Sequence, residues 1–460
     1  MHSRTTCKYL TPYSLLQTLD SQGGNIRFMK KILVIPTLSP DDFSETIHLV
    51  ELKSKKVERI NINNSDLKDY IGKMVDRGLT DKCLPYGYTK RKQLVPFFAA
   101  PHGVTPCGVN EVYIFYQEAP IFRKLNIQTW EVSTLPAGVD SFGFDGDKIF
   151  PSTAMSYKDG RMFLFANSAK ERYQHLLGKI DCMTFSLYEF IPETKKLAYL
   201  DGPFEGLTEN IHQMAISESG ILVFLDMTLA VKGNFRKWEN ATDTLIYSEE
   251  FQKDYAPREF PKGNMFLYDM NSKRLIKTDA EIPATAHVVF DPRYSNVFYV
   301  SMHNISKFMT NVVFHGPGKI VKYEYKDGKI SKLGCFTQPN FLRITTHKVF
   351  KYRDKALMAV TVFPNTAYLI DCDTMNLYKK VELFQCKLQH DGKYPFLSIT
   401  NKDKRIALYL DISDDGEWIY LSGPQYIYYL NVESGKIEDS FQFSETSSSA
   451  VSHNCLIYQE

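Results

Sequence analysis

An excess of charge of one sign is absent from this sequence. The 460 residues include 55 Lys and Arg against 53 Asp and Glu, which gives a formal net charge of +2 at pH 7. Domains that bind nucleic acids or anionic membrane surfaces electrostatically usually carry a clear basic excess. The balance of charge therefore argues against a nucleic-acid partner.

Cysteine pairs at metal-binding spacing are also absent. The eight cysteines are scattered along the chain, and none forms a Cys-x-x-Cys pair. This spacing favours reduced thiols in a cytoplasmic protein over a disulfide scaffold or a zinc ribbon.

Long apolar runs are missing as well. No run reaches the length of a transmembrane helix, and residues 1–28 lack the apolar core of a signal peptide. We therefore expect no transmembrane segment. We interpret residues 1–28 as a weakly ordered extension, either native or a leader placed ahead of Met29, and residues 29–460 as a single domain.

Several motifs of nucleotide binding and hydrolysis are not found. The sequence contains no GxGxxG, Walker, HExxH or GxSxG pattern, so dinucleotide-binding, zinc-protease and serine-hydrolase functions lack their usual residues. The acidic segment 371–373 is too short for a calcium-binding loop, and we interpret it as a turn between strands.

What the sequence does contain is a repeat of β-rich hairpins. A β-rich run, a short polar turn and a second β-rich run recur at 46–61, 185–202, 264–279, 319–334, 366–383 and 426–441, with a weaker copy at 112–132. Turns such as Lys-Asp-Gly and Glu-Ser-Gly between alternating apolar runs are hairpin signals.

A second hairpin precedes most of these copies, as at 214–226, 288–301, 349–362 and 409–422. Two hairpins in each unit make a four-stranded blade, and the unit lengths are those of a β-propeller. We therefore predict an all-β, seven-bladed β-propeller. A two-sheet sandwich is the alternative, but it does not explain seven copies.

The chain ends predict how the ring closes. The sequence stops in a lone strand pattern around Cys455-Leu-Ile-Tyr, and it begins with a strand around Ile32-Leu-Val-Ile-Pro and a hairpin that lacks an innermost strand. Pairing the two ends completes a blade and removes two exposed sheet edges.

Two insertions interrupt the repeat, at 62–100 and 228–262. The first contains a helical pattern over 65–79, and the second is rich in aromatic residues. Loops of this length in a compact domain are usually functional, and we predict that they form a small lid on the histidine-bearing end. Apolar candidates for a substrate wall in the second insertion are Trp238, Tyr247, Phe251 and Tyr255.

Histidines recur at the starts of the predicted innermost strands. Counting back from the strand turns gives His212, His287 and His347 in three consecutive units, Leu408 and Ser152 in two others, and His453 on the closing strand. Histidine makes up 11 of 460 residues, so chance would place fewer than one in seven such positions. Imidazoles at equivalent blade positions surround one mouth of the axis, as a shared metal requires. His102 fits the pattern more loosely, and we interpret His303 as a lining or loop residue.

The distribution of histidines among the predicted blades resembles that of the carotenoid cleavage dioxygenases. The resemblance rests on histidines in three consecutive blades, a last histidine close to the C-terminus, and the segment 211–229, in which an apolar strand follows His212 and ends in Asp226. It implies a seven-bladed propeller whose Fe²⁺ is held by His212, His287, His347 and His453. It also implies an oxygenase that acts on an apolar or aromatic alkene with dioxygen, with Leu408 and Ser152 facing the open side.

Two other functions stay open at this point. One is a copper-dependent oxidase on a propeller, similar to the selenium-binding and methanethiol oxidase family. The other is a non-catalytic propeller that binds a protein or small ligand, with histidines that merely line its channel, because propellers host many unrelated activities. Carboxylates that orient the imidazoles are expected, and Glu209 is a candidate for that role.

Overall fold

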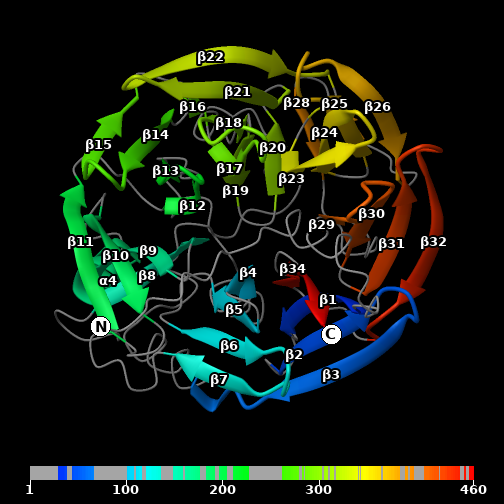
Figure 1. The fold of residues 1–460 in the computed structure, drawn as a ribbon, viewed down its shortest axis with the longest axis horizontal. Coiled ribbons are helices and arrows are strands. Elements are labelled where there is room, and N and C mark those ends of the chain that lie inside the picture. Colours follow the sequence, from blue (N-terminus) through cyan, green and yellow to red (C-terminus); the bar gives the residue numbers. More distant parts are fainter. Residues whose placement is uncertain are drawn as a thin grey trace, which may run out of the picture.

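The computed structural model is an all-β ring of seven four-stranded blades (Figure 1). The structure describes residues 30–38, 44–66, 101–107, 110–116, 121–135, 149–158, 161–176, 183–191, 196–204, 211–226, 262–278, 282–283, 285–302, 305–308, 311–314, 317–339, 341, 343–363, 366–383, 389–391, 394–397, 409–423, 425–445, 450–451 and 455–459. The predicted fold class is confirmed. The proposed extension 1–28 lies outside the described residues.

Blades 1 to 3 come from the first part of the chain, with blade 1 completed by the C-terminus. From the axis outward, blade 1 is β34 (Cys455–Gln459) with the short β33 (Ala450–Val451), β1 (Lys30–Leu38), β2 (Glu45–Glu51) and β3 (Lys56–Ile62). Blade 2 is β4 (Pro101–Cys107), β5 (Glu111–Tyr116), β6 (Phe122–Asn126) and β7 (Val132–Leu135). Blade 3 is β8 (Ile149–Lys158), β9 (Arg161–Ser168), β10 (Phe185–Ile191) and β11 (Lys196–Phe204).

Blades 4 to 7 follow in chain order. Blade 4 is β12 (Ile211–Ile216), β13 (Ile221–Asp226), β14 (Lys262–Asp269) and β15 (Arg274–Lys277), with β16 (Ile282–Pro283) beside β14. Blade 5 is β17 (Thr285–Phe290), β18 (Val297–Met302), β21 (Lys319–Lys326) and β22 (Lys329–Phe336). Blade 6 is β23 (Arg343–Tyr352), β24 (Lys355–Phe363), β25 (Thr366–Asp371) and β26 (Leu377–Glu382). Blade 7 is β29 (Tyr409–Ile412), β30 (Trp418–Ser422), β31 (Tyr426–Asn431) and β32 (Lys436–Gln442).

The two chain ends meet in blade 1, as predicted. The C-terminal strand β34 pairs antiparallel with β1, with Ile32 opposite Ile457 and Val34 opposite Cys455, and the red and blue strands lie side by side in Figure 1. Leu33 and Val34 are fully buried. Closure therefore satisfies the backbone groups of both terminal strands and buries their side chains against the neighbouring blades.

The predicted insertions leave the ring from one end, which we call the entry mouth because the inner strands begin there. Strand β13 ends at Asp226, which lies opposite Ile211, the first residue of β12. Strand β3 ends at Ile62, opposite Glu45 at the start of β2. Residues 67–100 and 228–261 lie outside the described residues, so the lid stays a prediction.

A buried ion pair holds the start of the first insertion. Arg123 and Glu45 are fully buried and 3.0 Å apart, and Arg123 also donates to Asp66 Oδ1 at 3.0 Å. A buried charge is stable only when it is paired and hydrogen-bonded. This contact joins blade 1, blade 2 and the helical start at Ser65 and Asp66.

The sequence analysis did not predict a further sheet at the entry mouth. It consists of β19 (Ile305–Phe308) and β20 (Asn311–Phe314), inserted between β18 and β21, and of β27 (Gln389–Asp391) and β28 (Tyr394–Leu397), inserted between β26 and β29. The two hairpins join where Val312 and Val313 pair with Leu397 and Phe396. It forms a bridge from blade 5 to the connection between blades 6 and 7.

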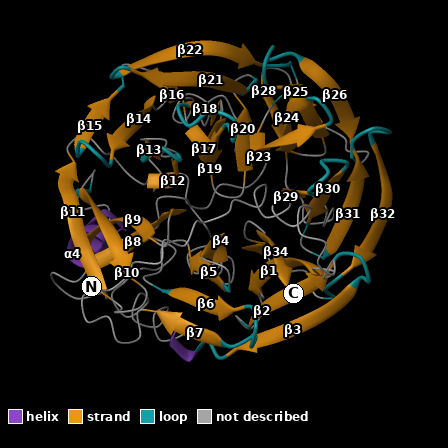
Figure 2. Cartoon of the chain, viewed as in Figure 1, coloured by secondary structure: helices purple, strands orange, loops and turns teal. Residues whose placement is uncertain are grey.

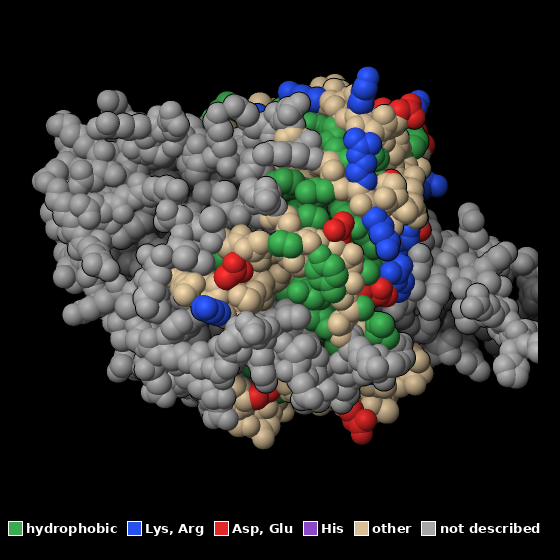
Figure 3. Space-filling model, turned by 90° about the vertical axis from the view of Figure 1, so that its left-hand side faces the viewer, with side chains coloured by type: hydrophobic (Ala, Val, Ile, Leu, Met, Phe, Trp, Pro, Cys, Tyr) green, Lys and Arg blue, Asp and Glu red, His purple; other side chains and the backbone are tan. Residues whose placement is uncertain are grey.

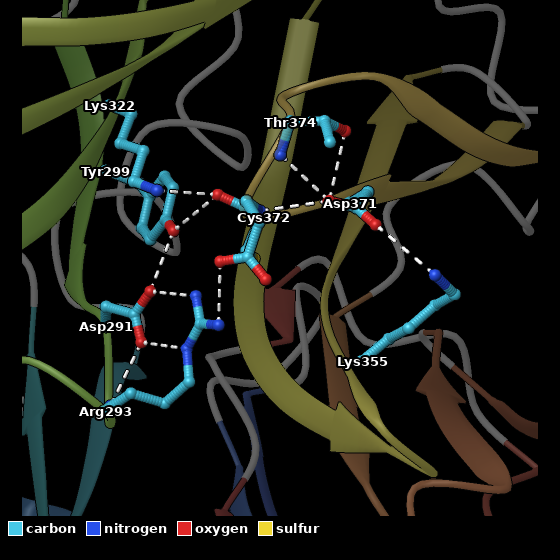
Figure 4. Close-up of polar contacts among 9 residues, drawn as sticks. Asp291, Arg293, Tyr299, Lys322, Lys355, Asp371, Cys372 and Thr374 are labelled. Carbon is cyan, nitrogen blue, oxygen red and sulfur yellow. Dashed lines mark hydrogen bonds and ion pairs between the residues drawn. The ribbon is translucent and has the colours of Figure 1, made fainter.

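Polar contacts lock blade 5 to blade 6 at the end opposite the entry mouth (Figure 4). Arg293 Nη2 lies 2.8 Å from Asp291 Oδ2, and Arg293 Nη1 lies 2.8 Å from Asp373 Oδ1 on the neighbouring blade. The Tyr299 hydroxyl donates to Asp291 Oδ2 at 2.9 Å. The buried Lys322 ammonium donates to the Cys372 carbonyl at 2.8 Å. The Arg293–Asp373 ion pair and the buried Lys322 bond cross from blade 5 to blade 6, and such charge-assisted bonds fix the spacing of the two blades.

The outer strands show how the blade edges are protected. Most of them carry Lys, Arg, Glu or Asp, which discourages edge-to-edge pairing. The outer strand β11 of blade 3 carries Lys196 and Asp201 and also an exposed Tyr199. The side of the ring formed by the left-hand blades of Figure 1 shows a group of hydrophobic side chains at its centre (Figure 3).

Helix contributes little to the described structure (Figure 2). The helix α4 (Ala169–Leu176) follows β9, and the Ser168 hydroxyl caps it by accepting a hydrogen bond from the Glu171 amide at 3.1 Å. Within the described ranges, no helix has both the length and the apolar character needed to cross a membrane.

Deleting residues 449–460 should abolish the native ring, because β1 then loses its inner partner and its inner edge is exposed. We expect an insoluble product or one without cooperative unfolding, measured by circular dichroism on heating. As a milder test, Ile457→Ala should lower the free energy of unfolding by about 2–4 kcal/mol, whereas the exposed Lys30→Ala on the paired strand should change it by less than about 0.5 kcal/mol. A truncated protein that unfolds cooperatively at the wild-type temperature would contradict the closure.

Candidate functional site

Four inner strands begin with the same irregularity at the entry mouth. The register against the second strand shifts by one residue in β4, β12, β17 and β23. The bulged residues, each left without a partner, are His102, His212, Ala286 and Thr345. A bulge of this kind changes the direction of the side chains that follow and is common next to functional sites.

The bulges give the histidines different registers, and the prediction of one shared position is wrong. His212 is itself the bulged residue of its strand, His287 lies one residue after the bulge, and His347 lies two residues after it. The register counterpart of His212 is His102, at the bulge of β4. Counting from the turns failed because it assumed strands of uniform length.

Two of the predicted ligands nevertheless lie together. The rings of His287 in blade 5 and His347 in blade 6 have centroids 6.2 Å apart and cross at 83°. Both side chains are buried, with 7% and 5% of their surface exposed. They occupy the interface between the inner strands β17 and β23, above the apolar cluster that fills the rest of this junction.

His287 is held by two polar side chains. Its backbone amide donates to Ser301 Oγ at 3.0 Å, and its Nδ1 lies 3.0 Å from Gln213 Oε1, on the preceding blade. The same Gln213 oxygen accepts a hydrogen bond from the Val288 amide at 2.9 Å. Ser301 is fully buried. The backbone of His287 is therefore fixed from its own blade, and its ring is oriented from the blade before it.

His347 presents a different environment. Among the described residues, neither of its ring nitrogens has a hydrogen-bond partner of normal geometry. Burial lowers the pKa of His347 to about 4, and the backbone of Tyr299 opposes this effect only in part. The ring is therefore neutral at physiological pH, and at least one nitrogen carries an unused lone pair.

The structure describes only part of the other predicted site residues. His212 and Ser152 lie on β12 and β8, where the structure describes the backbone but not these side chains, and the same holds for His102 on β4. Residues outside the described ranges are His303, Leu408, His453 and Glu209, together with Trp238, Tyr247, Phe251 and Tyr255. Their roles stay predictions.

The described part of the chain contains no group of three or more His, Cys, Asp or Glu side chains placed to hold a metal. What it contains is a pair of adjacent buried imidazoles, one oriented by an amide and one without a partner. Sequence reasoning missed Gln213 and Ser301. Gln213 follows His212 directly, but its contact to the next blade depends on the bulge, which the sequence does not reveal.

The fold thus defines this chain as a seven-bladed β-propeller. No known family matches its sequence, and no curated protein resembles it significantly. Among solved structures, apo AztD from Citrobacter koseri aligns with 93% of this chain and 98% of its own, at 11% identity and a TM-score of 0.44. A chain of the Mitotic Checkpoint Complex aligns with 84% of this chain and 82% of its own, at 8% identity and a TM-score of 0.45. Neither similarity bears on function.

A second buried histidine, His48 in blade 1, lies away from this site. Its Nε2 lies 3.1 Å from Thr37 Oγ1, and its Nδ1 has no hydrogen-bond partner among the described residues. The centroids of the His48 and Phe443 rings are 5.0 Å apart. Burial, with a smaller contribution from the positive charge of Arg59, lowers the pKa of His48 to about 4. His48 is therefore a natural comparison for His347.

The low pKa of His48 makes a prediction about stability against pH. Between about pH 6.5 and pH 4 the unfolded chain protonates this ring while the folded protein keeps it neutral, so the unfolded state binds more protons. The free energy of unfolding should therefore fall as the pH falls through this window. We expect wild type to lose roughly 2 kcal/mol more than His48→Gln between pH 7 and pH 5, measured by urea denaturation. Parallel pH profiles for the two proteins would show that burial does not perturb His48.

Proposed function

We propose that this protein is a metal-dependent oxygenase whose metal is bound by imidazoles at the entry mouth. The observation that carries the proposal is His347, a buried imidazole with both nitrogens unpartnered among the described residues, beside His287. Burying a polar group without a hydrogen bond costs free energy. A metal ion that accepts a nitrogen lone pair would offset that cost.

The state of the two rings suits this role. A metal competes with protons for imidazole nitrogen, so a ligand must be neutral when it binds. The lowered pKa of His347 keeps it neutral throughout the physiological range. The ring of His287 is already oriented by Gln213 while Ser301 holds its backbone, and metal-binding imidazoles are usually oriented by such a contact.

The residues that would hold the metal are His287 and His347, with His212 on the adjacent inner strand and His453 on the closing strand. Iron is the preferred metal, and Fe²⁺ bound by neutral imidazoles leaves open positions at which dioxygen and a substrate can meet. The contribution of this chain is to orient the rings and to keep water from the site, which the burial of His287 and His347 supports.

The proposed substrate is an apolar or aromatic alkene, bound by the second insertion through Trp238, Tyr247, Phe251 and Tyr255. Leu408 and Ser152 would face the side through which substrate and dioxygen enter. The proposed location is cytoplasmic. Cys335 and Cys372, the cysteines whose side chains are described, are both free thiols, which is compatible with that location.

One observation favours a second candidate function, a propeller that binds a ligand without metal or catalysis. The histidines do not share a register, and His287 and His347 pack between blades instead of occupying equivalent positions around the axis. Channel-lining imidazoles need no common register. Copper in place of iron is the third possibility, and metal analysis separates all three.

The test is metal analysis of protein purified without a histidine tag and reconstituted anaerobically. We expect about one equivalent of iron for each chain, because the site binds a single ion. His347→Ala should weaken Fe²⁺ binding by more than the ~10- to 100-fold that is typical when an outer-shell partner is lost. Activity is then assayed by dioxygen consumption with apolar alkenes.

The matched control is His48→Ala, which removes another buried imidazole with a similarly lowered pKa, on the second strand of blade 1 instead of an inner strand. It should leave the iron content unchanged even where it lowers stability. Copper at one equivalent favours the oxidase. A wild-type protein that takes up neither metal, or equal iron loss in the two variants, rejects the metal site in favour of the ligand-binding propeller.

A further inference from the structure

A single side-chain oxygen connects the two inner strands that carry His212 and His287. Gln213 Oε1, on β12 of blade 4, lies 2.9 Å from the Val288 backbone nitrogen and 3.0 Å from His287 Nδ1, both on β17 of blade 5. Gln213 comes directly after the bulged His212, and His287 comes directly after the bulge of its own strand. The amide therefore bridges equivalent positions of two consecutive blades.

This contact decides which nitrogen of His287 carries the proton. A backbone N–H can only donate, so the Gln213 atom that faces Val288 must be the amide oxygen and not the amide nitrogen. An amide oxygen only accepts, so His287 Nδ1 must be the donor in its own contact with that oxygen. The neutral ring therefore has its proton on Nδ1 and its lone pair on Nε2.

The backbone of His287 strengthens this arrangement. Its amide donates to Ser301 Oγ at 3.0 Å, from the second strand of the same blade, and Ser301 is fully buried. The chain at the bulge is thus fixed by Ser301 while the ring is fixed by Gln213. A ring flip would break the contact to Gln213 and leave its half-buried amide oxygen with one donor in place of two, which is unfavourable.

We propose that Gln213 is a positioning residue, which selects the Nδ1–H tautomer of His287 and thereby makes Nε2 the nitrogen whose lone pair can coordinate a metal. The part that concerns the metal rests on the proposed function, whereas the tautomer is a property of the metal-free protein. Gln213 also fixes the strand that carries His212 against the strand that carries His287. The Gln213 amide would therefore determine both which nitrogen of His287 can bind the metal and how far apart the two ligand-bearing strands lie.

The tautomer can be measured on the full-length, metal-free protein by NMR with ¹⁵N-labelled histidine at pH 8, which is well above the usual histidine pKa. The His287 signals are identified by their loss in His287→Gln. We expect long-range ¹H–¹⁵N couplings typical of the Nδ1–H tautomer in wild type. Gln213→Leu should shift His287 towards the Nε2–H tautomer that free histidine prefers, and Gln213→Glu, which keeps an acceptor oxygen, should restore the wild-type pattern.

Metal binding is measured in parallel with Fe²⁺ under anaerobic conditions. Gln213→Leu should weaken the affinity by about 10- to 100-fold, the usual effect of losing a residue that orients a ligand, and Gln213→Glu should recover most of it. The control is Gln425→Leu, which removes another buried glutamine, one that donates to the Glu445 carbonyl in blade 7. It should leave both the tautomer and the affinity unchanged.

The outcomes separate this inference from the proposed function. An Nε2–H tautomer in wild type, or a tautomer that Gln213→Leu leaves unchanged, overturns the assignment whether or not metal binds. A tautomer that changes while the Fe²⁺ affinity stays the same overturns the positioning role. If wild type binds no metal but its tautomer depends on Gln213, the proposed function fails and the tautomer assignment stands.

Discussion

The pairing of β1 with β34 is the interaction on which the rest of this structure depends. It joins the two chain ends across seven residues of β1, through β34 and the short β33, and it turns an open array of blades into a ring. In a closed ring each inner strand lies between two neighbours, so its position is fixed from both sides. This constraint also positions the histidines, because His287 contacts Gln213 on one side and the ring of His347 on the other.

The junction between blades 5 and 6 shows how a polar pair can be kept inside an apolar ring. Ion pairs and the buried Lys322 hold the blades together at the end opposite the entry mouth. Between that lock and the entry mouth the interface is formed by an apolar cluster that includes Tyr299, Met358 and Val360. The imidazoles sit at the far end of this rigid junction. Their spacing is therefore set by the packing of whole blades, and the free-energy cost of burying His347 is met by the cooperative stability of the ring.

Sequence reasoning recovered the features that depend on local pattern. The hairpins, the seven blades and the pairing around Ile32 and Cys455 follow from alternating apolar residues and from the unmatched strand at each end of the chain. The bulges before His287 and His347 do not follow, because an extra residue in a strand leaves the composition unchanged and only alters pairing. The sheet of β19, β20, β27 and β28 was missed because its hairpins are short and join across 83 or more residues. The contact of Gln213 with the next blade is equally non-local.

X-ray absorption at the iron edge tests the central claim, imidazole ligation at the entry mouth, most directly. The sample is wild-type protein without a tag, loaded anaerobically with Fe²⁺, beside His347→Ala. The account predicts a nitrogen shell at about 2.0–2.2 Å with the outer-shell scattering of several imidazole rings, weaker by one ring in the variant. A shell of oxygen atoms without imidazole scattering, or identical spectra for the two proteins, would contradict it.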